Sequence, residues 1–142
     1  MRTKYENIVV EFACRVTIPF ILLFGVYVVT HGHYSPGGGF QGGAIIAASV
    51  MLLRLSLGKE RTSKMFPPKM APILGTIGLL IYAGTGLMPI LFGGMYLDYI
   101  YLPVPGVSGG SLRYLGILIV EIGVALAVFG VMLTIFDYLV GD

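Results

Sequence analysis

The sequence is poor in charged residues, has one cysteine and lacks tryptophan. Only 11% of its 142 residues are Asp, Glu, Lys or Arg, whereas a soluble domain carries about 25%. This composition argues against both a disordered chain and a water-soluble globule. A net charge of +2 leaves no broad basic face, which argues against nucleic-acid binding. The single Cys14 excludes an intrachain disulfide and disfavours a cysteine-based zinc site.

Long apolar segments dominate the chain instead. Hydrophobic residues make up 56% of it, and four segments are long enough to cross a bilayer core about 30 Å thick. They lie at about 8–30, 40–57, 72–92 and 114–139. The first is not a cleaved signal peptide, because it is too long and contains Glu11 and Arg15. We therefore predict an all-α integral membrane protein with four transmembrane helices in a single domain, residues 1–142.

The distribution of Lys and Arg predicts the orientation. Basic residues lie before the first segment and around the connection between the second and third, whereas the 31–39 loop has none. The positive-inside rule therefore places both termini and the 58–71 loop in the cytoplasm. In the outer 93–113 loop, prolines and glycines disfavour a helix, so we expect an extended or hairpin cap with interfacial tyrosines. Ser111 would cap the last helix.

A glycine-rich run, from His31 to Gly43, is the most distinctive stretch. It lacks the strand and the Gly-Lys-Ser/Thr ending of a phosphate loop. Two compatible interpretations remain. The small residues that continue into the second segment (Gly43, Ala44, Ala47 and Ala48) have the spacing of a close helix–helix contact. Alternatively, Gly37–Gly39 leave backbone N–H groups free to face a water-filled ion path.

The same run resembles the signature of the MnhB/MrpB family, the B subunits of Mrp-type multisubunit sodium/proton antiporters. The matching residues are Gly32, His33, Pro36, Gly37, Gly38, Gly39, Phe40, Gly42 and Gly43. The resemblance extends over nearly the whole chain. In the last segment the family usually has an Asp-Leu-Gly-Val-Tyr-Leu string. Here Glu121–Leu126 keeps an acid, but Ala125 replaces the possible Tyr, which puts any hydroxyl relay there in doubt.

The resemblance implies a non-catalytic subunit without a cofactor, in the plasma membrane of a prokaryote. Its partners would be the other antiporter subunits and the lipid bilayer. Related modules also occur in membrane-bound hydrogenases and sulfur-reducing complexes, where redox chemistry would belong to the partner subunits. A different interpretation is a self-sufficient, homo-oligomeric transporter or channel, which would act alone in liposomes. A membrane enzyme is disfavoured, because the candidate chemical groups are scattered over opposite helix ends.

Glu121 is the leading candidate for an ion or proton path. It lies about eight residues into the last predicted helix, where an acid costs roughly 2.5–3.5 kcal/mol to insert. Such a carboxyl could exchange a proton or bind sodium. The alternative is a protonated or neighbour-bonded group that specifies subunit packing. His33 is a second candidate, for proton entry or exit, or else for hydrogen bonding at an interface. Two histidines alone make a poor metal site.

Further charged residues lie near the predicted inner surface. Glu11 and Arg15 are four residues apart and share a helix face, which predicts an intrahelical ion pair. Beside a kink at Pro19, they could instead face the ion channel of a partner subunit. Arg54 is expected to extend outward to the headgroups. Asp137 is expected to be solvated or paired with a basic residue.

Overall fold

The computed structural model describes residues 4–32, 34 and 37–140, and this part of the chain is helical without strands. Its elements are α1 (Lys4–Thr30), α2 (Gly39–Leu57), α3 (Lys59–Met65), α4 (Met70–Leu91), the 3₁₀ helix η1 (Tyr99–Tyr101) and α5 (Gly110–Val140). The four long helices are each long and apolar enough to cross a membrane. The prediction of an all-α membrane protein with four spans is confirmed.

The connections differ from the sequence-based expectations. The connection between α2 and α4 contains α3, because Gly58 adopts φ 82° and ends α2 while its N–H still bonds to the Arg54 carbonyl. The connection between α4 and α5 is made of turns around η1 rather than an extended hairpin. Helix α5 begins at Gly110, so Ser111 lies inside the helix and the prediction that it caps α5 is wrong.

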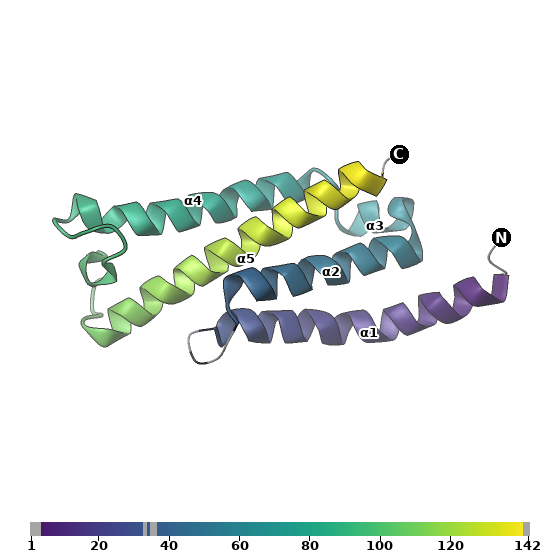
Figure 1. Cartoon of the computed structure of the whole chain (residues 1–142), viewed down its shortest axis with the longest axis horizontal. Coiled ribbons are helices and arrows are strands. Elements are labelled where there is room, and N and C mark those ends of the chain that lie inside the picture. The colour runs from purple at the N-terminus through teal and green to yellow at the C-terminus, as the bar shows by residue number, and fades with distance from the viewer. Residues whose placement is uncertain (1–3, 33, 35–36, 141–142) are drawn as a thin grey trace.

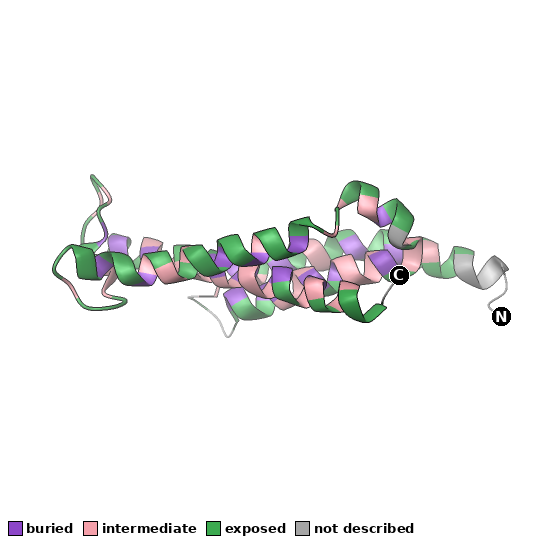
Figure 2. Cartoon of the chain, turned by 90° about the horizontal axis from the view of Figure 1, so that it is seen from above, coloured by how far each residue is buried: buried purple, intermediate pink, exposed green. Residues whose placement is uncertain are grey.

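The four long helices form one layer in the order α1, α2, α5, α4 (Figure 1). Each packs mainly on its neighbour in this row, and α1 and α4 do not touch within the described residues. Seen from above, the layer is thin (Figure 2). Because no second layer covers it, both faces expose large apolar side chains, such as Phe12, Phe20 and Leu80. These faces are suited to lipid or to other membrane proteins.

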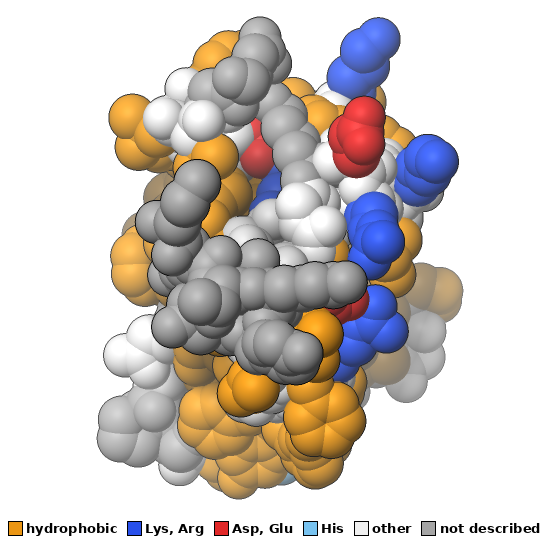
Figure 3. All heavy atoms as spheres, turned by 90° about the vertical axis from the view of Figure 1, so that its right-hand side faces the viewer, with side chains coloured by type: hydrophobic (Ala, Val, Ile, Leu, Met, Phe, Trp, Pro, Cys, Tyr) orange, Lys and Arg blue, Asp and Glu red, His pale blue; other side chains and the backbone are white. Residues whose placement is uncertain are grey.

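One end of the layer carries the start of α1, the end of α5 and the short helix α3 (Figure 1). Lys and Arg side chains are exposed on this end (Figure 3). The start of α1 and the end of α5 therefore lie at the same end of the layer. That this side is cytoplasmic stays a prediction from the positive-inside rule.

Helices α4 and α5 meet through glycines. A Cβ added at Gly78 would lie 2.5 Å from the carbonyl oxygen of Gly123, and one added at Gly130 would lie 2.5 Å from that of Ala71. Gly123 and Gly130 are seven residues apart, so they lie on the same side of α5. The missing side chains let the two backbones touch, as in other close helix pairs in membranes.

Helix α2 is packed closely on both sides. Toward α1, a Cβ at Gly42 would lie 2.9 Å from the Gly25 carbonyl oxygen. Toward α5, a Cβ at Gly43 would lie 2.5 Å from the Ala125 carbonyl oxygen, and Ala47 is fully buried. Gly43 and Ala47 lie in close helix contacts, as the interpretation of the small residues requires, and Ala44 is half-buried. Ala48 is exposed, so it does not take part in the close contact that was expected of it. This contact continues into a small apolar core formed by Ala47, Ala71, Phe129 and Leu133.

Candidate functional site

Glu121 lies on α5, beside the turn that joins α1 to α2. The end of α1 and the start of α2 lie only partway along α5, because the α4–α5 pair extends beyond them (Figure 1). Since α5 begins at Gly110, Glu121 is eleven residues from its start, or about 16 Å along the helix axis. The expected depth of eight residues is therefore an underestimate.

Glycines make room for the Glu121 carboxyl group. A Cβ at Gly32 would lie 2.5 Å from Oε1 of Glu121, and one at Gly38 would lie 3.2 Å from the same atom. The next residue, Gly39, packs directly on the backbone of Glu121. The φ angles of Gly37 and Gly38 are 155° and 123°, values that residues with a side chain rarely adopt. The glycines of this run thus have two roles: they allow backbone angles that other residues rarely adopt, and they leave space for the Glu121 carboxyl group.

One oxygen of the carboxyl group has no hydrogen-bond partner in the part of the chain that the structure describes. Oε2 of Glu121 is buried and makes no hydrogen bond to any described residue. The ion pairs of the described residues involve Glu11 and Asp137, not Glu121. A buried carboxylate without a partner is costly, so this group is suited to binding a proton or a cation.

His33 and Pro36 lie outside the described residues, and the proposed role of His33 stays a prediction. The neighbouring His31 is held at the end of α1. Its ring stacks on Tyr27 with centroids 4.2 Å apart, and its Nδ1 lies 3.1 Å from the Thr30 hydroxyl. Phe40 is 66% exposed, so its ring lies on the surface of the layer and not between helices.

Glu11 and Arg15 form the predicted ion pair. Nη2 of Arg15 donates to Oε1 of Glu11 at 2.7 Å, and Nη1 of Arg61 on α3 lies 3.7 Å from the same oxygen. Helix α1 continues through Pro19 without a break. The pair lies near the start of α1, whereas Glu121 contacts residues beyond its end. The structure therefore does not bring Glu11 and Arg15 together with Glu121.

Arg54 does not extend outward to the headgroups, and this prediction is wrong. The residue is only 5% exposed and forms an ion pair with Asp137 on α5. Its Nη2 also donates to the Phe66 carbonyl at 3.4 Å, and its guanidinium lies 5.9 Å from the centre of the Phe66 ring. The pairing of Asp137 with a basic residue is confirmed. Arg54 turns inward because the adjacent helix offers a counter-charge at the same depth.

In the connection between α4 and α5, tyrosine rings pack against glycines of the two helices. A Cβ at Gly86 would lie 2.9 Å from the Tyr96 ring, and one at Gly116 would lie 2.5 Å from the Tyr99 ring. Burial raises the pKa of Tyr99, and the neighbouring phenols of Tyr82 and Tyr96 raise it further. These rings cover the end of the α4–α5 pair at which the two helices are connected.

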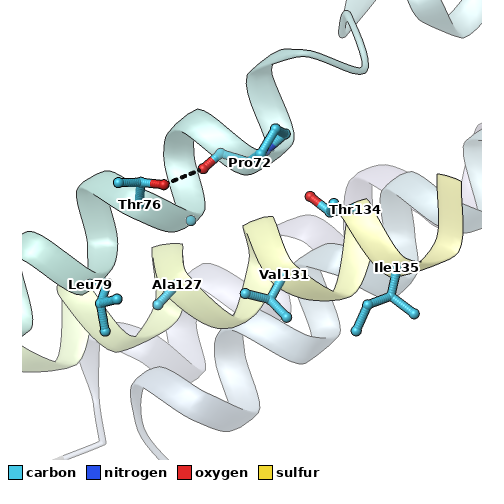
Figure 4. A pocket seen from close by; sticks show the side chains of 8 residues that line it. Pro72, Thr76, Leu79, Ala127, Val131, Thr134 and Ile135 are labelled. Carbon is cyan, nitrogen blue, oxygen red and sulfur yellow. Dashed lines mark hydrogen bonds between the residues drawn. The ribbon is translucent and has the colours of Figure 1, made fainter. Parts of the chain in front are cut away.

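An apolar groove of about 310 Å³ runs between α4 and α5 (Figure 4). Its only polar side chains bond within their own helices. The Thr76 hydroxyl donates to the Pro72 carbonyl at 2.9 Å, and the Thr134 hydroxyl donates to the Gly130 carbonyl at 2.6 Å. No ionisable residue lines this groove, so it is not suited to an ion. Among the described residues, no cluster of three or more His, Cys, Asp or Glu could hold a metal.

Comparison with known proteins adds an independent observation. The sequence profile of a family described as "Domain related to MnhB subunit of Na+/H+ antiporter" matches residues 9–134. The chain is 32% identical to the B subunit of a Na(+)/H(+) antiporter from Bacillus subtilis, over 93% of this chain and 92% of that protein. It is 31% identical to a protein of Staphylococcus haemolyticus named antiporter subunit mnhB2, over 93% of each chain.

Proposed function

Because the chain belongs to the MnhB family, we propose that it is a non-catalytic membrane subunit of a multisubunit sodium/proton antiporter. Its place would be the plasma membrane of a prokaryote, and its partners would be the other subunits of that antiporter. A ferredoxin-linked complex, such as a membrane-bound hydrogenase, is a second setting for the same module. The genes next to this one distinguish the two settings, since hydrogenase subunits would be encoded there.

The single-layer architecture supports a role inside a larger assembly. A row of four helices encloses no interior, so one copy of this chain cannot surround an ion path. Both faces of the row are apolar and exposed, and in a complex they can pack on other membrane helices. The alternative of a self-sufficient transporter would require several copies to enclose the path. It predicts ion transport by this chain alone in liposomes.

The buried, unpartnered oxygen of Glu121 is the observation that carries the proposed mechanism. We propose that this carboxyl lines the ion path and binds either a proton or Na⁺. Carboxylate oxygens suit hard cations, and protonation would remove the negative charge that attracts Na⁺. The two ions would therefore compete for one group, which is the exchange that an antiporter needs. Gly32 and Gly38 would keep side chains away from it.

Replacing Glu121 by Gln tests this mechanism, because Gln keeps the size of the side chain but does not ionise. The variant complex is assembled in the membrane, and Na⁺-dependent proton movement is measured in everted vesicles at matched amounts of complex. We expect transport to fall to the level of vesicles without the complex. Glu60→Gln is the control, because Glu60 is an exposed acid on α3, and it should transport normally.

Two outcomes separate the mechanism from a packing role. If Glu121→Gln assembles and transports like the unaltered complex, Glu121 is not on the ion path, and the glycine run serves packing alone. If Glu121→Gln fails to assemble, Glu121→Asp decides the question. An assembled Asp variant with a changed Na⁺ requirement supports the path, and one with an unchanged requirement contradicts it.

A further inference from the structure

Helices α2 and α5 touch at two distant points. They lie side by side in the layer and run in the same direction (Figure 1). At one end Gly39 packs on the backbone of Glu121. At the other end Arg54 pairs with Asp137. These contacts are 15 residues apart on α2 and 16 residues apart on α5, or about 22 Å and 24 Å along the two axes.

The contact between these two points is apolar. Gly43 packs against the Ala125 backbone, Ala47 is fully buried, and Ile46, Val50 and Met51 pack on the same apolar core. Apolar contacts of this kind are non-directional, so they specify the register of the two helices less sharply than a charged pair does. A charged pair is different, because its attraction depends on the position of both partners along the axes.

The Arg54–Asp137 pair is well placed to oppose sliding. The side chains of Arg54 and Asp137 are only 4% and 14% exposed, so both charges are largely shielded from solvent. Arg54 is also held from a second direction by the Phe66 carbonyl and ring, and Phe66 packs edge-on against Phe129 of α5. Losing the pair would leave a buried charge without a partner. One register of α2 on α5 is therefore strongly preferred.

We propose that the Arg54–Asp137 pair is a positioning device that sets this register and thereby holds Gly38 and Gly39 against Glu121. A slip by one residue would move these glycines by about 1.5 Å. That movement would displace Gly38 and Gly39 from the carboxyl, about 22 Å from the pair. The proposal rests on the proposed function of Glu121 in ion exchange. Arg54 and Asp137 would act through that site without touching the ion.

The test compares three sets of variants in the assembled complex. Asp137→Asn removes the pair and leaves Arg54 charged. The double variant Arg54→Met with Asp137→Leu replaces the pair by apolar side chains, which buried ion pairs often tolerate without loss of stability. Arg54→Lys keeps the charge and serves as the conservative variant. The first readout is the Na⁺ concentration that gives half-maximal proton movement, measured at matched amounts of complex.

A second readout reports the register without relying on transport. Phe40 of α2 and Val128 and Met132 of α5 line one small surface cavity. In a Cys14→Ser background, Phe40→Cys is paired with Val128→Cys or with Met132→Cys, and each pair is treated with a short bifunctional thiol reagent. The ratio of the two cross-linking yields reports the position of α2 along α5.

We expect the apolar double variant to assemble, to change the cross-linking ratio, and to raise the half-saturating Na⁺ concentration by about threefold or more. Arg54→Lys should stay close to the unaltered complex in both readouts. An unchanged cross-linking ratio in both Asp137→Asn and the double variant would overturn the positioning role, whatever Glu121 does. If the ratio changes while the Na⁺ requirement stays the same, the register role stands and the proposed function of Glu121 fails.

Discussion

The same substitution, Gly to Ala, is expected to have opposite effects at Gly43 and Gly84. Gly43 faces α5, where a Cβ would lie 2.5 Å from the carbonyl oxygen and 2.9 Å from the Cα of Ala125. Both atoms belong to the backbone and cannot rotate away. Gly84 is an exposed residue of α4, and a Cβ there would meet nothing within 4 Å.

The magnitude at Gly43 follows from the separation that a methyl group would impose. To reach ordinary contact, α2 and α5 must move apart by about 1 Å, and a gap of 0.5–1 Å already loses roughly a quarter to a half of the dispersion energy of each contact. Overpacking of this kind typically costs about 1–3 kcal/mol. At Gly84 the change removes the conformational cost of glycine in a helix and should gain about 0.5–1 kcal/mol.

The assay is the heat resistance of the purified complex, measured as the fraction that stays monodisperse after heating to a series of temperatures. We expect the midpoint temperature to fall for Gly43→Ala and to rise slightly or stay constant for Gly84→Ala. If the two variants have equal midpoints, α2 and α5 are not packed backbone against backbone, and the close contact at Gly43 is incorrect.

Two further predictions concern the glycine turn and the tyrosine cap. Gly38→Ala should raise the half-saturating Na⁺ concentration, because its Cβ would lie 3.2 Å from Oε1 of Glu121; its control, Gly109→Ala, also changes a glycine with a positive φ, 62°, but in open space. This control should cost about 1–2 kcal/mol without changing the Na⁺ requirement, so equal effects of both variants on the Na⁺ requirement would contradict the site. Tyr99 has a raised pKa, so its phenol should ionise above the ordinary range near pH 10. The contact of the Tyr99 ring with Gly116 should be intact below that range and be lost as the pH rises through the raised pKa. Absorbance titration of the unaltered protein and of Tyr99→Phe measures which phenol the substitution removes. If the missing phenol is one that ionises early in the titration, the raised pKa of Tyr99 is refuted.

Hydropathy predicted the spans, because a run of about 20 apolar residues has few other stable states in a membrane. The helix ends were harder to predict. Gly110 and Ser111 look like loop residues, yet α5 starts there and buries Leu112, so tertiary packing outweighs local preference. Helix α3 was missed because its seven residues are polar except for Met65 and give no apolar period.

The site depends on the order of helices in the layer, which a single sequence does not reveal. Small residues in the second span predicted a close contact but not its partner. Because α2 lies between α1 and α5, Gly38 and Gly39 lie against Glu121 and Arg54 pairs with Asp137. Arg54 was expected to reach the headgroups because snorkelling is the usual solution for a lone arginine at a helix end. It is not alone, because Asp137 provides a charge on the neighbouring helix.

The two acids of α5 therefore differ in what their surroundings supply. Asp137 has a guanidinium partner within the same chain that compensates its charge, although its Oδ2 is also buried without a hydrogen bond among the described residues. Glu121 has glycine backbone around it, a buried oxygen without a hydrogen-bond partner among the described residues, and no ion pair to any of them. Under the proposed mechanism, the carboxyl without a cationic partner exchanges a proton for a cation, and the paired carboxyl does not. This difference in partners is why transport should be lost when Glu121 is neutralised but only retuned when the Arg54–Asp137 pair is replaced.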